Sequence, residues 1–212
     1  MKKIDIRPLP EHLDTLGETS RYLDTLNKNR IDQAPWKEYP YIPSTSFSAA
    51  YTKRSIALKY YVSEKSIKST NIYPNRPVHE DSCVEFFIAF NNEAEYYNIE
   101  FNCTGTCSAG FGAERNTRRK ISEENIATIR HETLIRPSSL QNENIYWELA
   151  VIIPVSVFQF HAISDLKNTT CKVNFYKCGD KLPEPHFLAW SNIDHPLPNF
   201  HLPEYFGYGY FE

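Results

Sequence analysis

The chain has 212 residues, of which 41% are hydrophobic and 23% charged, a composition typical of a folded globular domain rather than a disordered segment. Its formal net charge of -3 provides no basic field for a nucleic-acid backbone, so we expect no nucleic-acid partner. No apolar stretch approaches the length of a membrane span, and we expect no membrane association.

The first 39 residues differ in pattern from the remainder of the chain. Five leucines recur near helical spacing: Leu9, Leu13, Leu16, Leu23 and Leu26. Because Gly17 interrupts this series, we predict one broken helix or two short ones. They would form a helical or irregular extension over residues 1–39, packed on a main domain of residues 40–212.

The cysteines are five in number and lack the paired spacing of a zinc site or a disulfide framework. They are Cys83, Cys103, Cys107, Cys171 and Cys178. The basic start of the chain also lacks the apolar segment that follows in a secretory signal. We therefore expect reduced, buried thiols and a cytoplasmic location.

From about residue 46 the hydrophobic pattern changes to a period of two, which is typical of half-buried strands. Residues 97–103 show the most regular alternation, and residues 82–90 are apolar enough for a central strand. Further strands are predicted at 56–62, 146–153, 171–176, 187–191 and 208–211. Many short strands joined by proline-rich loops predict an all-β fold, a two-sheet antiparallel β-sandwich of jelly-roll type with a short helical N-terminal segment.

Polar side chains on these strands are expected to share one outward face, because alternate residues of a strand point to the same side. They are Glu85, Glu100, Asn102, Asn174 and Tyr176. Carboxylates, amides and a phenol form a hydrogen-bonding floor suited to a polyol. Four basic residues are interpreted instead as a solvated loop or turn: Arg115, Arg118, Arg119 and Lys120.

Three short motifs carry a family resemblance. They are EDSCVEFFI at residues 80–88, YYNIEFN at 96–102, and the pair Trp190-Ser191 followed by PNFHLPEYFG at 198–207. In this order and spacing they resemble the family 9 carbohydrate-binding modules, which lie within the broader DOMON-like sandwiches. The resemblance spans roughly residues 40 to 212.

This resemblance implies a non-catalytic domain, linked to polysaccharide degradation, that clamps a sugar between two aromatic rings above a polar floor. It places Glu85 at a sugar-binding carboxylate and Phe200 at one clamping ring, whereas Val78 replaces the second ring. Glu100 and Tyr176 also depart from the family's residues. We expect the pocket in this place to include His79, Glu85, Glu100, Asn102, Tyr176, Lys177, Asn199, Phe200 and His201. No further cofactor is predicted, although such modules usually carry structural calcium.

Two alternatives stay open. A glycoside hydrolase would use a carboxylate pair, Glu85 with Glu100 or Asp81, on either side of the scissile bond. A cofactor-binding domain would hold haem through an axial ligand, but Met1 is the sole methionine, so a methionine ligand is excluded. No nucleophile motif or phosphate loop is recognisable.

Overall fold

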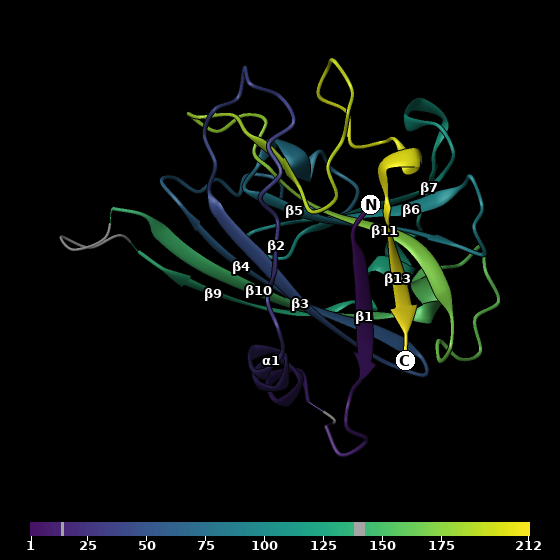
Figure 1. Ribbon diagram of the computed structural model, residues 1–212. Coiled ribbons are helices and arrows are strands. Elements are labelled where there is room, and N and C mark those ends of the chain that lie inside the picture. Colours follow the sequence, from purple (N-terminus) through teal and green to yellow (C-terminus); the bar gives the residue numbers. More distant parts are fainter. Residues whose placement is uncertain (14, 138–142) are drawn as a thin grey trace.

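The computed structural model describes residues 1–13, 15–137 and 143–212 (Figure 1). The first half of the chain forms β1 (Lys3–Pro8), α1 (Leu16–Thr25), β2 (Asn29–Arg30), β3 (Ser44–Thr52), β4 (Ser55–Glu64), β5 (Cys83–Phe90), β6 (Tyr96–Asn102) and β7 (Cys107–Gly112). The second half forms β8 (Arg119–Lys120), α2 (Glu123–Ile126), β9 (Arg130–Arg136), β10 (Ile145–Pro154), β11 (Thr170–Cys178), β12 (Phe187–Ala189) and β13 (Gly207–Phe211). Neither helix has the length and apolar character that crossing a membrane would require.

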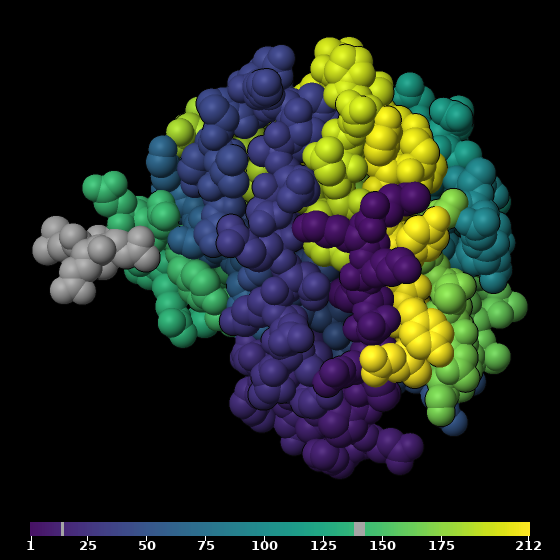
Figure 2. Space-filling view, viewed as in Figure 1, coloured from purple at the N-terminus to yellow at the C-terminus, as the bar shows by residue number. Residues whose placement is uncertain are grey.

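The strands form one curled sheet with two halves that face each other. One half has the order β8-β7-β6-β5-β11-β13, the other has the order β3-β4-β10-β9, and β1 lies between them. Lys3 to Ile6 of β1 pair with β13, whereas Arg7 and Pro8 pair with β3. Both of these pairings are parallel, and the other pairings are antiparallel. Figure 2 shows the purple N-terminal segment lying beside the yellow C-terminal strand.

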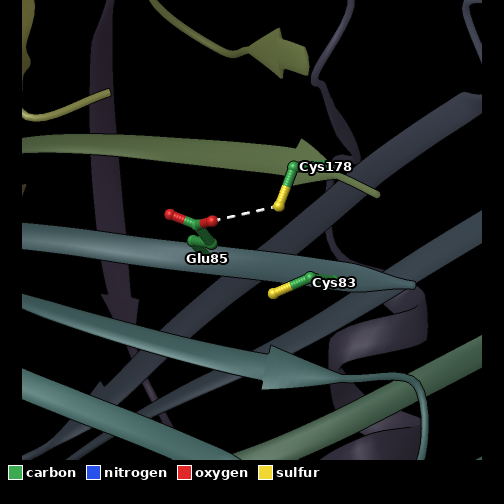
Figure 3. A group of neighbouring side chains, drawn as sticks. All are labelled: Cys83, Glu85 and Cys178. Carbon is green, nitrogen blue, oxygen red and sulfur yellow. Dashed lines mark hydrogen bonds between the residues drawn. The ribbon is translucent and has the colours of Figure 1, made fainter. Parts of the chain in front are cut away.

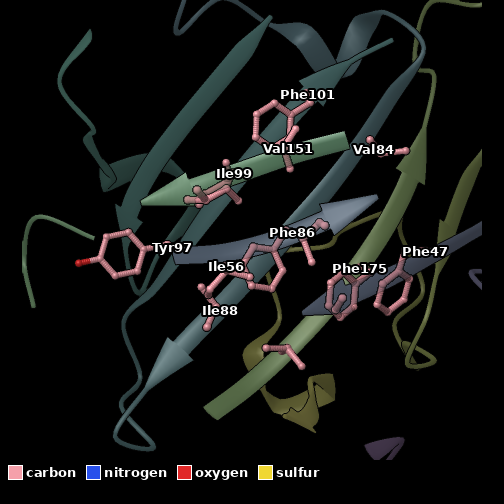
Figure 4. Packing of buried hydrophobic residues seen from close by; sticks show 14 of the residues in the cluster. Phe47, Ile56, Val84, Phe86, Ile88, Tyr97, Ile99, Phe101, Val151 and Phe175 are labelled. Atoms are coloured by element: carbon pink, nitrogen blue, oxygen red, sulfur yellow. The ribbon is translucent and has the colours of Figure 1, made fainter. Parts of the chain in front are cut away.

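The main hydrophobic core fills the space between the two halves. Val84, Phe86 and Ile88 of β5 pack there because they alternate with residues that face the opposite side. Phe175 of β11 stacks on Phe47 of β3, with ring centroids 3.7 Å apart. Figure 4 shows these side chains converging from strands of both halves. At about 25 cal/mol per Å² of apolar surface removed from water, this core is the dominant favourable contribution to folding.

The outward face of the β5 half carries a second cluster of buried residues, which includes Phe87, Tyr176 and Phe200. Loops from distant parts of the chain cover this face, among them the segments around Trp36 and Phe206. A third cluster, which includes Leu23 and Ile152, lies where α1 packs on the other half. The molecule therefore has an apolar layer outside each half as well as between them.

Sequence analysis predicted the dominance of β structure and most strands, and the structure confirms these predictions. The purely antiparallel arrangement was wrong, because β1 adds parallel pairs on both of its sides. Residues 1–39 contain one unbroken helix, which begins after the capping residue Thr15 and includes Gly17, and they also contribute β1 and β2. Sequence analysis missed β1 because the leucine spacing favoured a helix in this part of the chain. Ile4 and Ile6 alternate along β1 and pack in the core.

Candidate functional site

A pocket of about 480 Å³ opens on the outward face of the β5 half. Its floor is formed by side chains of three adjacent strands, β5, β6 and β7. Further lining residues precede β5 or lie at the end of β11: Asn75, Arg76, Pro77, His79, Cys178 and Asp180. Other walls are contributed by residues 198–201 and by Arg115, Asn116, Arg118 and Lys120. The pocket thus combines a rigid floor on paired strands with walls built by loops, an arrangement typical of ligand-binding sites.

The floor follows from strand register. Glu85 of β5 lies opposite Glu100 of β6, and Asn98 of β6 lies opposite Gly110 of β7. The Asn98 amide donates to a Glu100 oxygen at 2.7 Å. A Cβ atom at Gly110 would lie 3.0 Å from the Asn98 side-chain oxygen, so the glycine leaves room for this amide. The floor therefore presents two carboxyl groups and an amide that hold one another in place.

The two floor carboxyls have opposite protonation tendencies. Burial and the nearby Glu100 charge raise the pKa of Glu85 well above its usual value. Burial opposes ionisation of Glu100 as well, but its contacts with His79 and Asn98 outweigh that cost and lower its pKa. The His79 Nδ1 atom lies 3.7 Å from a Glu100 oxygen, and this contact raises the pKa of His79. The floor thus favours a proton on Glu85 and a negative charge on Glu100.

Glu85 also contacts two buried cysteines, Cys83 and Cys178, shown in Figure 3. The Cys178 thiol donates to a Glu85 oxygen at 3.1 Å. Burial raises the pKa of Cys83 to about 12, which favours the protonated thiol. Calcium prefers about six to eight oxygen ligands, and this group offers two sulfur atoms and one carboxyl. The described side chains therefore bring no trio of carboxylates together for the calcium that the resemblance implies.

A cationic wall, defined here as Arg115, Arg118 and Lys120, lines the pocket on the β7–β8 side. Arg118 donates from Nε to the Asn98 side-chain oxygen at 2.6 Å and from Nη2 to the Tyr96 carbonyl at 2.6 Å. Arg115 and Lys120 are exposed, as the interpretation of a solvated loop or turn expects, whereas Arg118 is half-buried and bonded to Asn98 of the floor. The spacing of these basic residues in the sequence does not predict a pocket wall, because β8 pairs with β7 only in the tertiary structure.

Phe200 contributes an aromatic surface, but most of its ring is covered. It stacks on Tyr176 with centroids 4.2 Å apart and an interplanar angle of 10°, and it retains 8% exposure. The ring centroid of Trp36 lies 5.9 Å from that of Phe200, and Phe187 also lines the pocket. Val78, at the position of the second clamping ring, is fully buried. The described residues thus leave no open two-ring clamp around the pocket.

The structure brings together six of the nine predicted site residues on the pocket wall: His79, Glu85, Glu100, Asn199, Phe200 and His201. Tyr176 lies directly behind Phe200, and its hydroxyl donates to the Phe200 carbonyl at 3.1 Å. Sequence reasoning missed Asn98, Ser108 and Asp180, which also line the pocket. The alternation of β6 pointed to Asn98, since it lies between Tyr96 and Glu100 on the polar face.

Asn102 and Lys177 do not line the pocket, contrary to prediction. The Asn102 amide donates to an Asp81 oxygen at 3.1 Å, and its own oxygen accepts from the Thr104 and Thr106 backbone, so it ties a turn together. Lys177 points to the inner face of β11, where its ammonium group lies 2.9 Å from a Glu64 oxygen. Its position two residues after Phe175 already placed it on the apolar face.

Comparisons with known proteins agree with this architecture. Residues 19–211 match the model of carbohydrate-binding family 9. A crystal structure of a putative carbohydrate-binding protein from Bacteroides uniformis ATCC 8492 is 36% identical, with a TM-score of 0.91 over 100% of this chain and 99% of the other. No curated protein matches the chain.

Two structures of a family 9 module from Caldicellulosiruptor kristjanssonii share the fold at 12% identity. Its complex with glucose has a TM-score of 0.61 and covers 100% of this chain and 96% of the other. Its complex with cellotriose has a TM-score of 0.62, with 100% and 94% covered. The family match spans most of the sequence and accounts for the motifs as well as the fold. The chain therefore belongs to carbohydrate-binding family 9.

Proposed function

We propose that this domain binds a mono- or oligosaccharide in the pocket above Glu85, Asn98 and Glu100. The observation that carries the proposal is the floor itself, where two carboxyls and an amide face one open hollow from paired strands. Sugar hydroxyls both donate and accept hydrogen bonds, so they match the two carboxyls and the adjacent amide. The glucose and cellotriose complexes of the Caldicellulosiruptor module support this ligand class.

The domain is a binding module rather than an enzyme, since its family comprises non-catalytic carbohydrate-binding modules. The glycoside hydrolase alternative is not favoured. Glu85 and Glu100 project side by side from neighbouring strands of one floor, and Glu85 accepts a hydrogen bond from Cys178. A hydrolase needs its two carboxyls to flank the scissile bond instead.

Isothermal titration calorimetry of the protein against glucose, cellotriose and a panel of other mono- and oligosaccharides tests the proposal. We expect binding heat for at least one sugar and a loss of affinity of about tenfold or more in Glu100→Gln, which removes a charged acceptor. Glu148→Gln is the matched control, since Glu148 pairs with Lys59 in the other half of the sheet. Equal affinity in wild type and Glu100→Gln would reject this pocket as the site.

A further inference from the structure

The charge of the pocket walls differs from that of the whole chain. The chain has a net charge of -3, yet four permanent cations line this one pocket: Arg76, Arg115, Arg118 and Lys120. Three acidic residues line it as well: Glu85, Glu100 and Asp180. Burial raises the pKa of Asp180. The pocket is therefore a local positive region on an acidic protein.

Among the described residues these cations have no carboxylate partner of their own. In the described part of the chain, none of the four comes within ion-pair distance of an acidic side chain, whereas the adjacent Arg119 pairs with Glu95 at 3.2 Å. Arg118 donates to neutral acceptors, namely the Asn98 side chain and the carbonyls of Tyr96 and Gly112. Lys120 lies 3.5 Å from the Ser108 hydroxyl. Their positive charges thus remain unneutralised at the pocket wall.

A neutral sugar would gain little binding energy from these cations. Stacking on aromatic rings is the usual apolar contribution to sugar binding, but Phe200 is mostly covered and Val78 is buried. Hydrogen bonds between ionised groups are roughly twice as strong as neutral ones, so an acidic substituent would gain most from this wall. Sugar hydroxyls would meanwhile face the Glu85 and Glu100 side of the floor, where a second anion would be repelled.

We infer that the ligand is an anionic carbohydrate, a sugar with a carboxylate or sulfate ester whose negative group contacts the cationic wall. This inference rests on the proposed function and narrows its substrate class. Arg115 and Lys120 contact the acidic group directly, because both are exposed at the pocket. Arg118 is a positioning residue that holds Asn98 and the β7 carbonyls.

The test compares glucose with two analogues that differ at carbon six, glucuronate and glucose 6-sulfate, by calorimetry at low salt. We expect at least one anionic analogue to bind about tenfold tighter than glucose. Raising the ionic strength from about 0.05 to 0.5 M should lower the affinity for the anionic sugar and leave the affinity for glucose unchanged. Preference for glucuronate identifies a uronic acid, and preference for glucose 6-sulfate identifies a sulfated sugar. Either result supports the inference.

Variants separate the wall from the floor. Arg115→Gln and Lys120→Gln together should lower the affinity for the anionic sugar about tenfold more than the affinity for glucose. Arg119→Gln removes a neighbouring charge that pairs with Glu95 outside the pocket, and it should change neither ligand. Glucose binding as tightly as both analogues would overturn this inference and leave the proposed function standing. Absence of heat with every sugar would overturn both.

Discussion

Two clusters of buried charge lie on opposite faces of the β5–β11 pair and serve different purposes. On the inner face, Glu64, Lys177 and His186 are completely buried, with the Lys177 ammonium 2.9 Å from Glu64 and 2.8 Å from His186. On the outer face, Glu85 and Glu100 open to the pocket. The inner charges are paired with one another, whereas the outer ones border a cavity that a ligand can enter. Residue type alone therefore does not distinguish a binding site from a structural ion pair.

The sealed cluster should dominate stability. Lys177→Met would leave Glu64 as a buried carboxylate without its cation, and we expect a loss of about 3–5 kcal/mol in the free energy of unfolding. Urea denaturation followed by circular dichroism measures this. Lys65→Met removes a lysine from an exposed pair with Glu184 and should cost much less, because solvent screens such a pair. Similar losses in the two variants would mean that Lys177 is not paired as described.

The pocket cluster should contribute to binding rather than to stability. In Glu100→Gln the amide keeps a hydrogen-bond acceptor for Asn98 and removes a buried charge, so we expect stability to stay within about 1 kcal/mol of wild type. Urea denaturation of this variant, carried out alongside the sugar titration, checks the expected stability. A large loss of stability would show that the Glu100 charge is structural, like that of Glu64.

Three histidines in and around these clusters should titrate differently. Burial, followed by the positive charge of Lys177, lowers the pKa of His186 to about 3, and burial followed by Arg118 lowers that of His201 to about 3. Contact with Glu100 instead raises the pKa of His79. Two-dimensional nuclear magnetic resonance of the imidazole rings should show His79 protonating above pH 6.5 while the other two stay neutral. A common pKa for all three would contradict the different environments.

These shifts have opposite effects on stability. The unfolded chain takes up protons at His186 and His201 near pH 6.5, but the folded chain resists until about pH 3, so both residues make stability fall as the pH drops through this window. His79 stabilises the fold at pH values below its unfolded pKa, and this contribution is lost as pH rises through the higher folded value. In His201→Asn the free energy of unfolding should therefore depend less on pH between about 3 and 6.5. In His79→Asn it should depend less on pH around and above 6.5.

The smallest effect concerns the cysteines. All five described thiols are buried and unpaired, and burial raises the pKa of Cys103 and Cys171 to about 12. We expect them to react with a thiol reagent such as dithionitrobenzoate only as the protein unfolds. Rapid labelling of Cys178 in the folded protein would show that the pocket floor opens. The predicted cytoplasmic location is not tested by this experiment and stays a prediction.

The sequence by itself determined the strands and their faces, because alternation of apolar and polar residues follows from local backbone geometry. It therefore predicted that Glu85 and Glu100 share an outward face, and the register of β5 and β6 confirms this. It could not determine β1, which reaches the core through partners more than forty residues away. Parallel pairing of that kind depends on long-range packing rather than on local propensity.

Only the tertiary structure decided which polar residues face the pocket. Arg118 reaches Asn98 across twenty residues of chain because β7 and β8 fold back beside β6. Lys177 instead pairs with Glu64 between the two halves, more than a hundred residues away in sequence. The partners of a charged side chain in three dimensions determine whether its charge is neutralised inside the fold or left available to a ligand. Spacing along the sequence does not predict those partners.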